Sequence, residues 1–161
     1  MRRIAALAIS AALAASMVVA AQPASASGDW DLILKNDVPV IVDQHIVDGV
    51  VLTRVFKAVV RDSSGKKVGR LVGQQELFDV KVEGDDIETR LRTIIFDLKG
   101  GQIIAEGVSN YPIKGGGKFR PGKAFTIAIT GGTGAYVGVR GELVSILKSD
   151  GTYRQKFRFV D

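Results

Sequence analysis

From Val50 to the end of the chain, apolar and polar residues alternate in runs separated by short turns. In the last run, Tyr153–Val160, aromatic residues and one glutamine alternate with arginine and lysine. A period of two places one set of side chains on a buried face and the other in water, as in a half-buried strand. No helical pattern interrupts this part of the chain. The sequence therefore predicts an all-β domain, either a sandwich or a small closed barrel.

The expected strands end at clusters of turn residues. Asp62–Gly65, Glu83–Asp86, Lys99–Gly101 and Ser149–Gly151 are such clusters, rich in the residues that favour tight turns. A glycine- and proline-rich stretch, 111–122, is expected to be a long loop. Gly138 and Gly141 within an expected strand indicate a bulge or sharp bend. The expected strands are 38–42, 50–61, 67–82, 87–98, 102–108, 125–129, 136–147 and 153–160.

The first 26 residues have the layout of a secretory signal. Arg2 and Arg3 precede an alanine-rich apolar run, and an Ala-x-Ala site ends at Ala26; this is the order of a signal peptide. A membrane anchor is the alternative. We expect cleavage near Ala26 and a secreted protein. The predicted organisation is a signal peptide at 1–26, an N-terminal arm and first strand at 27–49, and a barrel core at 50–161.

Composition excludes several classes of site and partner. The chain has no cysteine, so neither disulfides nor a lipid-anchored form is available, and His45 is its one histidine; a zinc site rich in these residues is therefore not expected. Cleavage removes two of the 22 basic residues and none of the 17 acidic ones, for a net charge of +3. A charge this small does not indicate a nucleic-acid surface. We expect no metal, no nucleic acid and, after cleavage, no membrane.

A glycine-rich stretch, Ala128–Leu147, has some features of a nucleotide-binding motif. Gly132-Thr133-Gly134 follows an apolar run, but a dinucleotide motif requires a helix to begin at the glycines. The residues that follow, AYVGVRGELV, are poor helix formers. The motif is therefore interpreted as a structural turn, made of Gly131, Gly132, Thr133 and Gly134.

The run ITGGTGAYVGVRGE resembles the signature of the allene oxide cyclase and dirigent barrel superfamily. Residues 139–141 resemble the Ala-Arg-Gly of dirigent members, and residues 138–141 resemble the GVYG of the cyclases. Upstream, residues 65–73 and 101–107 resemble two earlier strands of the family, in the same order. The resemblance implies a closed antiparallel barrel of about eight strands, a size that can hold one small ligand.

The resemblance also implies a function, that of a cofactor-free isomerase or cyclase. Such a barrel binds a small apolar or aromatic molecule and guides its cyclisation or stereoselective coupling by holding it in one conformation. Members are commonly trimers, so a homotrimer is expected. Two alternatives remain: a carrier barrel that releases its ligand unchanged, and a packed structural or interaction barrel without a cavity.

Individual site residues follow from the same resemblance. Arg140 stands where dirigent members place a pocket arginine, and could hold a phenolic or carboxylate oxygen; alternatively it pairs with Glu142 or Glu106 and only closes the core. Gln75 stands where the cyclases carry a pocket cysteine. Ala135 stands where dirigent members often have an aspartate, which is a departure from the pattern.

Carboxylates on central strands are the remaining candidates for acid–base chemistry. Asp97 is one of these carboxylates. A carboxylate that faces the interior would have a raised pKa, but the pattern alone does not say which of them face inward. The catalytic candidates are Arg140, Glu106 and Glu76. The predicted substrate pocket comprises Gln75, Tyr136, Arg140, Tyr153 and Phe157.

Overall fold

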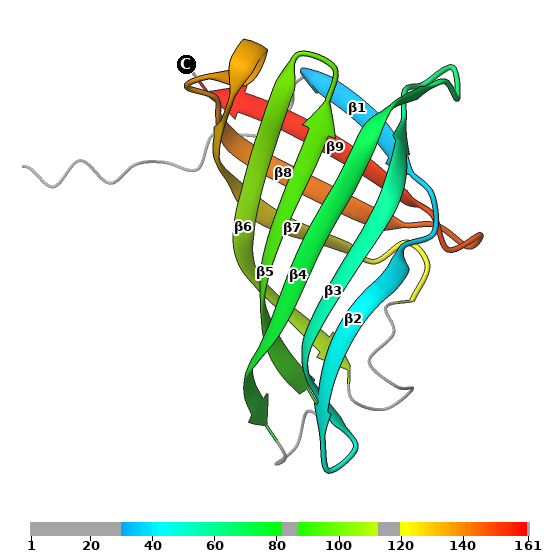
Figure 1. Ribbon diagram of the computed structural model, residues 1–161, viewed down its shortest axis with the longest axis vertical. Coiled ribbons are helices and arrows are strands. Elements are labelled where there is room, and N and C mark those ends of the chain that lie inside the picture. The colour runs from blue at the N-terminus through cyan, green and yellow to red at the C-terminus, as the bar shows by residue number, and fades with distance from the viewer. Residues whose placement is uncertain (1–29, 82–86, 113–119, 161) are drawn as a thin grey trace, which may run out of the picture.

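A computed structural model describes residues 30–81, 87–112 and 120–160 (Figure 1). The proposed signal peptide and the predicted turn at 83–86 lie outside these residues. The described chain forms nine strands and one short 3-10 helix: β1 Leu32–Asn36, β2 Val40–Val47, β3 Val50–Arg61, β4 Lys67–Lys81, β5 Ile87–Leu98, β6 Gly101–Pro112, β7 Ala124–Gly132, η1 Gly134–Tyr136, β8 Arg140–Leu147 and β9 Tyr153–Val160.

The strands form one antiparallel sheet that closes on itself. Their order is β1-β9-β8-β7-β6-β5-β4-β3-β2, and β1 also pairs with β3. That extra pairing joins Lys35 to Arg61 and Asn36 to Val60. Strands β1 and β3–β9 therefore make a closed eight-stranded barrel, and β2 is an additional strand on its edge. The predicted all-β barrel is confirmed.

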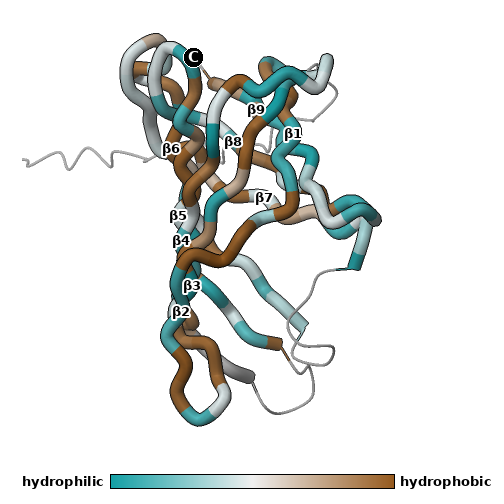
Figure 2. Tube along the Cα trace, turned by 45° about the vertical axis from the view of Figure 1, so that its right-hand side comes forward, coloured by the Kyte–Doolittle hydropathy of each residue, from teal (hydrophilic) through white to brown (hydrophobic). Residues whose placement is uncertain are grey.

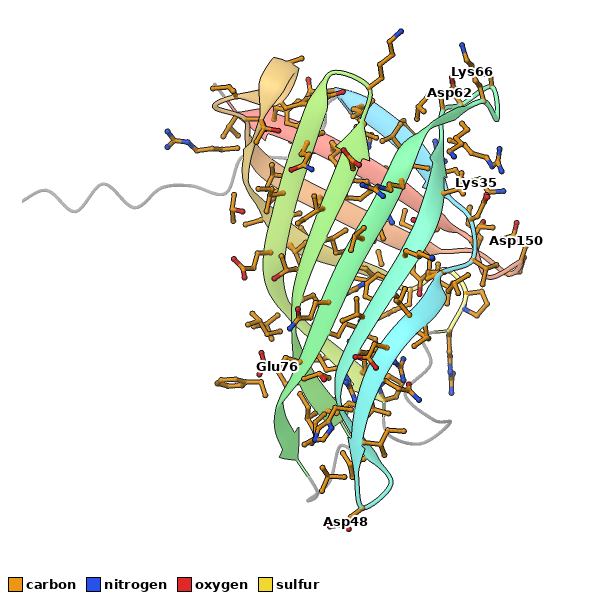
Figure 3. The ribbon with its side chains drawn as sticks, viewed as in Figure 1. Lys35, Asp48, Asp62, Lys66, Glu76 and Asp150 are labelled. Carbon is orange, nitrogen blue, oxygen red and sulfur yellow. The ribbon has the colours of Figure 1, made fainter. Side chains whose placement is uncertain are left out.

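Strand β2 extends beyond the barrel as one arm of a hairpin with β3. Its two-residue turn is Asp48-Gly49, with φ of 49° and 81°, which fits the Asp-Gly preference of a type I′ turn. Figure 3 shows Asp48 at the tip of the hairpin. Every residue of β2 is exposed, although much of the hairpin is hydrophobic in Figure 2.

Most predicted strands are present, with two corrections. The predicted strand 136–147 is wrong at its start, because Gly134–Tyr136 is a 3-10 turn and β8 begins only at Arg140. Gly138 has a φ of 85°, which an extended strand does not have. The predicted loop 111–122 is wrong at its first two residues, because β6 continues to Pro112; residues 113–119 lie outside the described part.

The interior changes from apolar to polar along the barrel axis. On β5 the inward positions are Phe96, Ile94, Arg92 and Arg90, all buried. Phe96 lies edge-on to Phe157, with ring centroids 4.9 Å apart, and both are fully buried. The apolar core thus fills the end of the barrel nearest the β5–β6 turn, and the polar interior lies toward the other end.

Candidate functional site

A cavity of about 430 Å³ lies in the polar half of the barrel. Its apolar surface includes Phe56, Leu71 and Ile94, which belong to the buried core. Val38 and Ile41, which are about half exposed, also line it. The cavity therefore rests on the core at one end and reaches the surface near the connection between β1 and β2.

Three polar residues on adjacent strands form one row in the cavity wall. Strand pairing sets Arg54 opposite Gln75 and Gln75 opposite Arg92. All three line the cavity. Directly paired residues on neighbouring strands point to the same face of a sheet. The register of β3, β4 and β5 therefore places two guanidinium groups and an amide side by side inside the barrel.

Arg92 is held against aromatic rings. Only 5% of the residue is exposed, and its Cζ atom lies 4.0 Å from the centroid of the Phe125 ring and 5.9 Å from that of Tyr111. Burial lowers the pKa of Arg92, and the nearby Tyr111 opposes that shift. Arginine nevertheless stays protonated in proteins. The site therefore contains a buried cation on an aromatic face.

Two tyrosine hydroxyls line the same cavity. Gln75 Nε2 donates a hydrogen bond to Tyr111 Oη at 2.9 Å. Burial raises the pKa of Tyr111 to about 12 and also raises the pKa of Tyr153, against the opposing effect of Arg92. Both phenols are thus neutral at physiological pH and available for hydrogen bonding rather than as bases.

The cavity wall opposite the row of Arg54, Gln75 and Arg92 contains a chain of hydrogen bonds between buried polar side chains. Ser145 Oγ donates to Gln155 Oε1, Gln155 Nε2 donates to Asn36 Oδ1 at 2.6 Å, and Asn36 Nδ2 donates to the Asp37 carbonyl at 2.8 Å. Buried polar groups need such partners. This chain connects β8, β9 and β1 and fixes the shape of that wall.

The described residues that line the cavity limit its chemistry. They include two arginines and two tyrosines but no carboxylate, histidine or lysine. Positioned cations can stabilise negative charge that develops on a substrate oxygen. Within residues 30–81, 87–112 and 120–160, no three metal-ligating side chains of the His, Cys, Asp or Glu type come together. The same residues include no helix long and apolar enough to cross a membrane.

The comparisons with known proteins bear on the fold. No protein-family model matches the chain, and no curated protein sequence matches it. The solved structure of a pyocyanin demethylase is similar, at 22% identity with a TM-score of 0.59, over 80% of this chain and 98% of that one. The fold is that of a small β-barrel protein.

A second solved structure is also similar in fold to this chain. It is described as a nonspecific heme-binding cyclase that catalyses a [4 + 2] cycloaddition during neoabyssomicin biosynthesis. The identity is 13% and the TM-score 0.55, over 79% of this chain and 60% of the cyclase chain. At these identities the likeness concerns the barrel alone.

Of the pocket residues proposed from sequence, the structure brings two to the cavity. Gln75 and Tyr153 line it. Phe157 is fully buried in the apolar core, and Tyr136 lies half-buried in η1, packed against that core. Arg140 is exposed at the start of β8, and Glu142 lies 3.9 Å from Arg158.

The carboxylate candidates lie on the outside of the barrel. Glu76 and Glu106 are exposed, and Figure 3 shows Glu76 projecting from the outer side of β4. Glu106 accepts a hydrogen bond from Thr93 at 3.1 Å, and Asp97 pairs with Arg70 at 2.8 Å. Because successive residues of a strand face opposite ways, an inward Gln75 requires an outward Glu76.

The predicted glycine turn lies at the core end of the molecule, and it is wrong at its first two residues, because Gly131 and Gly132 are the last residues of β7 and only Gly134 belongs to η1. The Thr133 N–H donates to the Gln102 carbonyl at 2.9 Å, and the Ala135 N–H donates to the Gly100 carbonyl at 2.8 Å. A side chain at Gly134 would overlap the Gly100 carbonyl. The turn thus packs against the β5–β6 turn, and its four residues are not among those that line the cavity.

Sequence reasoning missed Arg54, Arg92 and Tyr111. A signal for Arg92 was present, because it shares the period-two face of β5 with Ile94 and Phe96. A charged residue on an apolar face is an informative exception to the usual pattern. Tyr111 falls in the predicted loop, whereas in the structure it is a buried residue near the end of β6.

Proposed function

We propose that this protein is a secreted β-barrel that binds a small apolar or aromatic molecule and guides its cyclisation or coupling without a cofactor. The cavity is the observation that carries the proposal. Its volume of about 430 Å³ falls in the range of small-molecule sites, about 300–1,000 Å³, and such sites combine apolar walls with a few convergent polar groups. The resemblance to allene oxide cyclases and dirigent proteins supports the same function.

The proposed mechanism relies on positioning. Phe56, Phe125 and Ile94 give the substrate an apolar surface, and the fixed wall limits its conformations. Arg92 stabilises negative charge that develops on a substrate oxygen, and the burial of its guanidinium group strengthens that interaction. Holding the reacting atoms close together lowers the entropic part of the barrier.

A carrier without catalysis is the second candidate function. The absence of a carboxylate or histidine among the described lining residues favours it over reactions that need a strong base. Turnover separates the two functions, because a carrier releases its ligand chemically unchanged. The packed structural barrel is disfavoured by the volume of the cavity.

Secretion and a homotrimer are part of the proposal. The alanine-rich leader supports secretion, and a mature N-terminus at Ser27 in the culture medium is the expected result. Val72, Leu91 and Val108 are exposed apolar side chains of β4, β5 and β6, which supports assembly because large apolar patches mark interaction sites. Light scattering of the mature protein should give three times the chain mass.

Native mass spectrometry of the protein from its own culture medium tests ligand binding. We expect an excess mass that denaturation removes. In Leu147→Trp an indole at a half-buried lining position should displace the ligand. Val160→Trp, at an exposed position of β9, is the control and should retain it. A barrel that stays empty in all three proteins and takes up no compound from the culture extract would contradict the proposal.

A further inference from the structure

Two arginines that line the cavity, Arg54 and Arg92, have no described carboxylate beside them. Arg90 on the same strand as Arg92 is different, because its Nε atom lies 2.7 Å from Glu88 Oε1. The Nη2 atom of Arg90 also donates to the Val51 carbonyl at 2.9 Å. Arg90 is thus neutralised by Glu88, whereas the positive charges of Arg54 and Arg92 face the cavity.

Specific donor atoms of the two arginines are buried without acceptors. Among the described residues, Arg54 Nε, Arg92 Nε and Arg92 Nη1 have no hydrogen-bond partner, and neither has Arg90 Nη1, although Glu88 balances the charge of Arg90. Burial of a charge or a polar group without partners is costly, and natural proteins retain few such groups. A partner that arrives from outside explains why these donors are kept.

The surroundings of the donors restrict what that partner is. Arg92 stacks on Phe125, and the Phe125 ring lies 6.5 Å from that of Tyr153, in an edge-on arrangement. Aromatic rings bind other rings by stacking and edge contacts. Guanidinium groups bind carboxylates by charge-assisted hydrogen bonds in a fixed geometry. The cavity therefore offers an anion site beside an aromatic site.

We infer that the ligand of this cavity is a planar aromatic acid whose carboxylate accepts hydrogen bonds from Arg92 and Arg54. Its ring system lies against Phe125 and Tyr153, and the neutral Tyr111 hydroxyl stands beside the carboxylate. This inference rests on the proposed small-molecule function and adds the class of ligand. Tight binding requires both a negative charge and an aromatic ring on the ligand. A neutral aromatic molecule of equal size therefore binds more weakly than the acid.

The test compares 2-naphthoate with 2-naphthamide, which has the same shape and no charge. Isothermal titration of the mature protein should show naphthoate binding about tenfold or more tightly than naphthamide, as expected for charge-assisted hydrogen bonds. Arg92→Met should abolish the preference for the acid, and Arg54→Met should reduce it. Arg140→Met, at the exposed start of β8, should leave it unchanged.

Thermal stability separates a binding role of Arg92 from a structural one. Removing a buried charge that has no carboxylate partner should leave the melting temperature of ligand-free Arg92→Met equal to or above that of the wild type. A structural role predicts a lower melting temperature. If the methionine variant does not fold, Arg92→Lys supplies the test, because it retains the charge and should retain a weakened preference for the acid.

The outcomes distinguish this inference from the function on which it rests. Equal affinity for naphthoate and naphthamide, or a preference that survives Arg92→Met, overturns the aromatic acid and leaves small-molecule binding intact. Failure of both probes to bind also overturns the aromatic acid. A protein that is empty in native mass spectrometry and takes up no compound from the culture extract is the separate result that removes the function itself.

Discussion

Single residues in the cavity wall serve either the fold or the ligand, and Gln155 serves the fold. Its amide accepts from Ser145 and donates to Asn36, and all three residues are buried. Gln155 is thus the partner of both the Ser145 hydroxyl and the Asn36 side-chain oxygen. By contrast, Arg92 has donors that the fold itself leaves without partners.

The first prediction concerns Gln155→Leu, which keeps the size of the side chain and removes its amide. Ser145 and Asn36 then lose a partner in the interior. We expect a loss of about 1–3 kcal/mol in the free energy of unfolding for each buried group left without a partner. Urea denaturation measures it. Gln74→Leu, the same change on the exposed face of β4, should be close to neutral; equal effects of the two substitutions would contradict the prediction.

At the scale of one element, β4 shows how a glycine can shape a site. Gly73 lies directly opposite Phe56 on β3. A Cβ atom at Gly73 would overlap the Phe56 ring, so the ring lies over the bare backbone. The floor of the cavity therefore depends on the absence of a side chain.

The second prediction is that Gly73→Ala displaces the Phe56 ring toward the cavity. Overpacking of this kind costs about 1–3 kcal/mol of stability, which denaturant titration will show. Addition of Phe56→Leu should restore part of the loss, because the smaller side chain makes room for the methyl group. Gly131→Ala is the control, since a Cβ there meets nothing within 4 Å. Lack of any rescue by Phe56→Leu would point to another cause.

Elements also show what could be predicted from the sequence. Strands 50–61 and 87–98 were predicted at the bounds that the structure has, because alternation is a local property. Residues 136–139 were predicted as strand, although β8 begins only at Arg140. The turn that precedes it is fixed by a hydrogen bond from Ala135 to Gly100, a contact distant in sequence. The sequence did not show whether Glu76 and Glu106 face inward or outward. Closure of the barrel decides which of the two alternating sets of side chains on a strand faces the interior.

At the scale of the whole molecule, the seam between β1 and β3 closes the barrel. Arg61 binds Asp37 through two nitrogens, with Nε–Oδ1 and Nη2–Oδ2 distances of 3.0 and 2.9 Å. The hydrogen bond from Arg61 lowers the pKa of Asp37 below its usual value of 3.8, and the positive charge of Arg61 adds to this effect. Desolvation of the carboxylate acts in the opposite direction. The ion pair is partly exposed, so its contribution is modest and screened by salt.

The third prediction follows from that lowered pKa. A carboxyl whose pKa is lower in the folded state stabilises the fold above its unfolded pKa, and this contribution is lost as the pH falls through the folded value. Asp37→Asn should therefore be less stable than the wild type at pH 7, and the difference should shrink below pH 3.8. Urea midpoints across pH 2–7 measure it.

Other carboxyls set the background for this experiment. Hydrogen bonds from Ser64 and Thr152 lower the pKa of Asp62 and Asp150, so some acid sensitivity should remain in the variant. Asp43→Asn, on the exposed β2, is the control and should follow the wild-type curve. A stability difference between Asp37→Asn and wild type that stays constant down to pH 2 would contradict the assignment.

The pairing of β1 with β9 also determines when during synthesis the protein can fold. Leu32 on β1 is opposite Phe157 on β9, the last of the described strands. A ribosome must therefore release the chain from β1 through β9 before these two strands can pair, whereas the shorter pairing of β1 with β3 can form earlier. Contacts so distant in sequence slow folding, and a chain that closes late would remain threadable for the secretion proposed above.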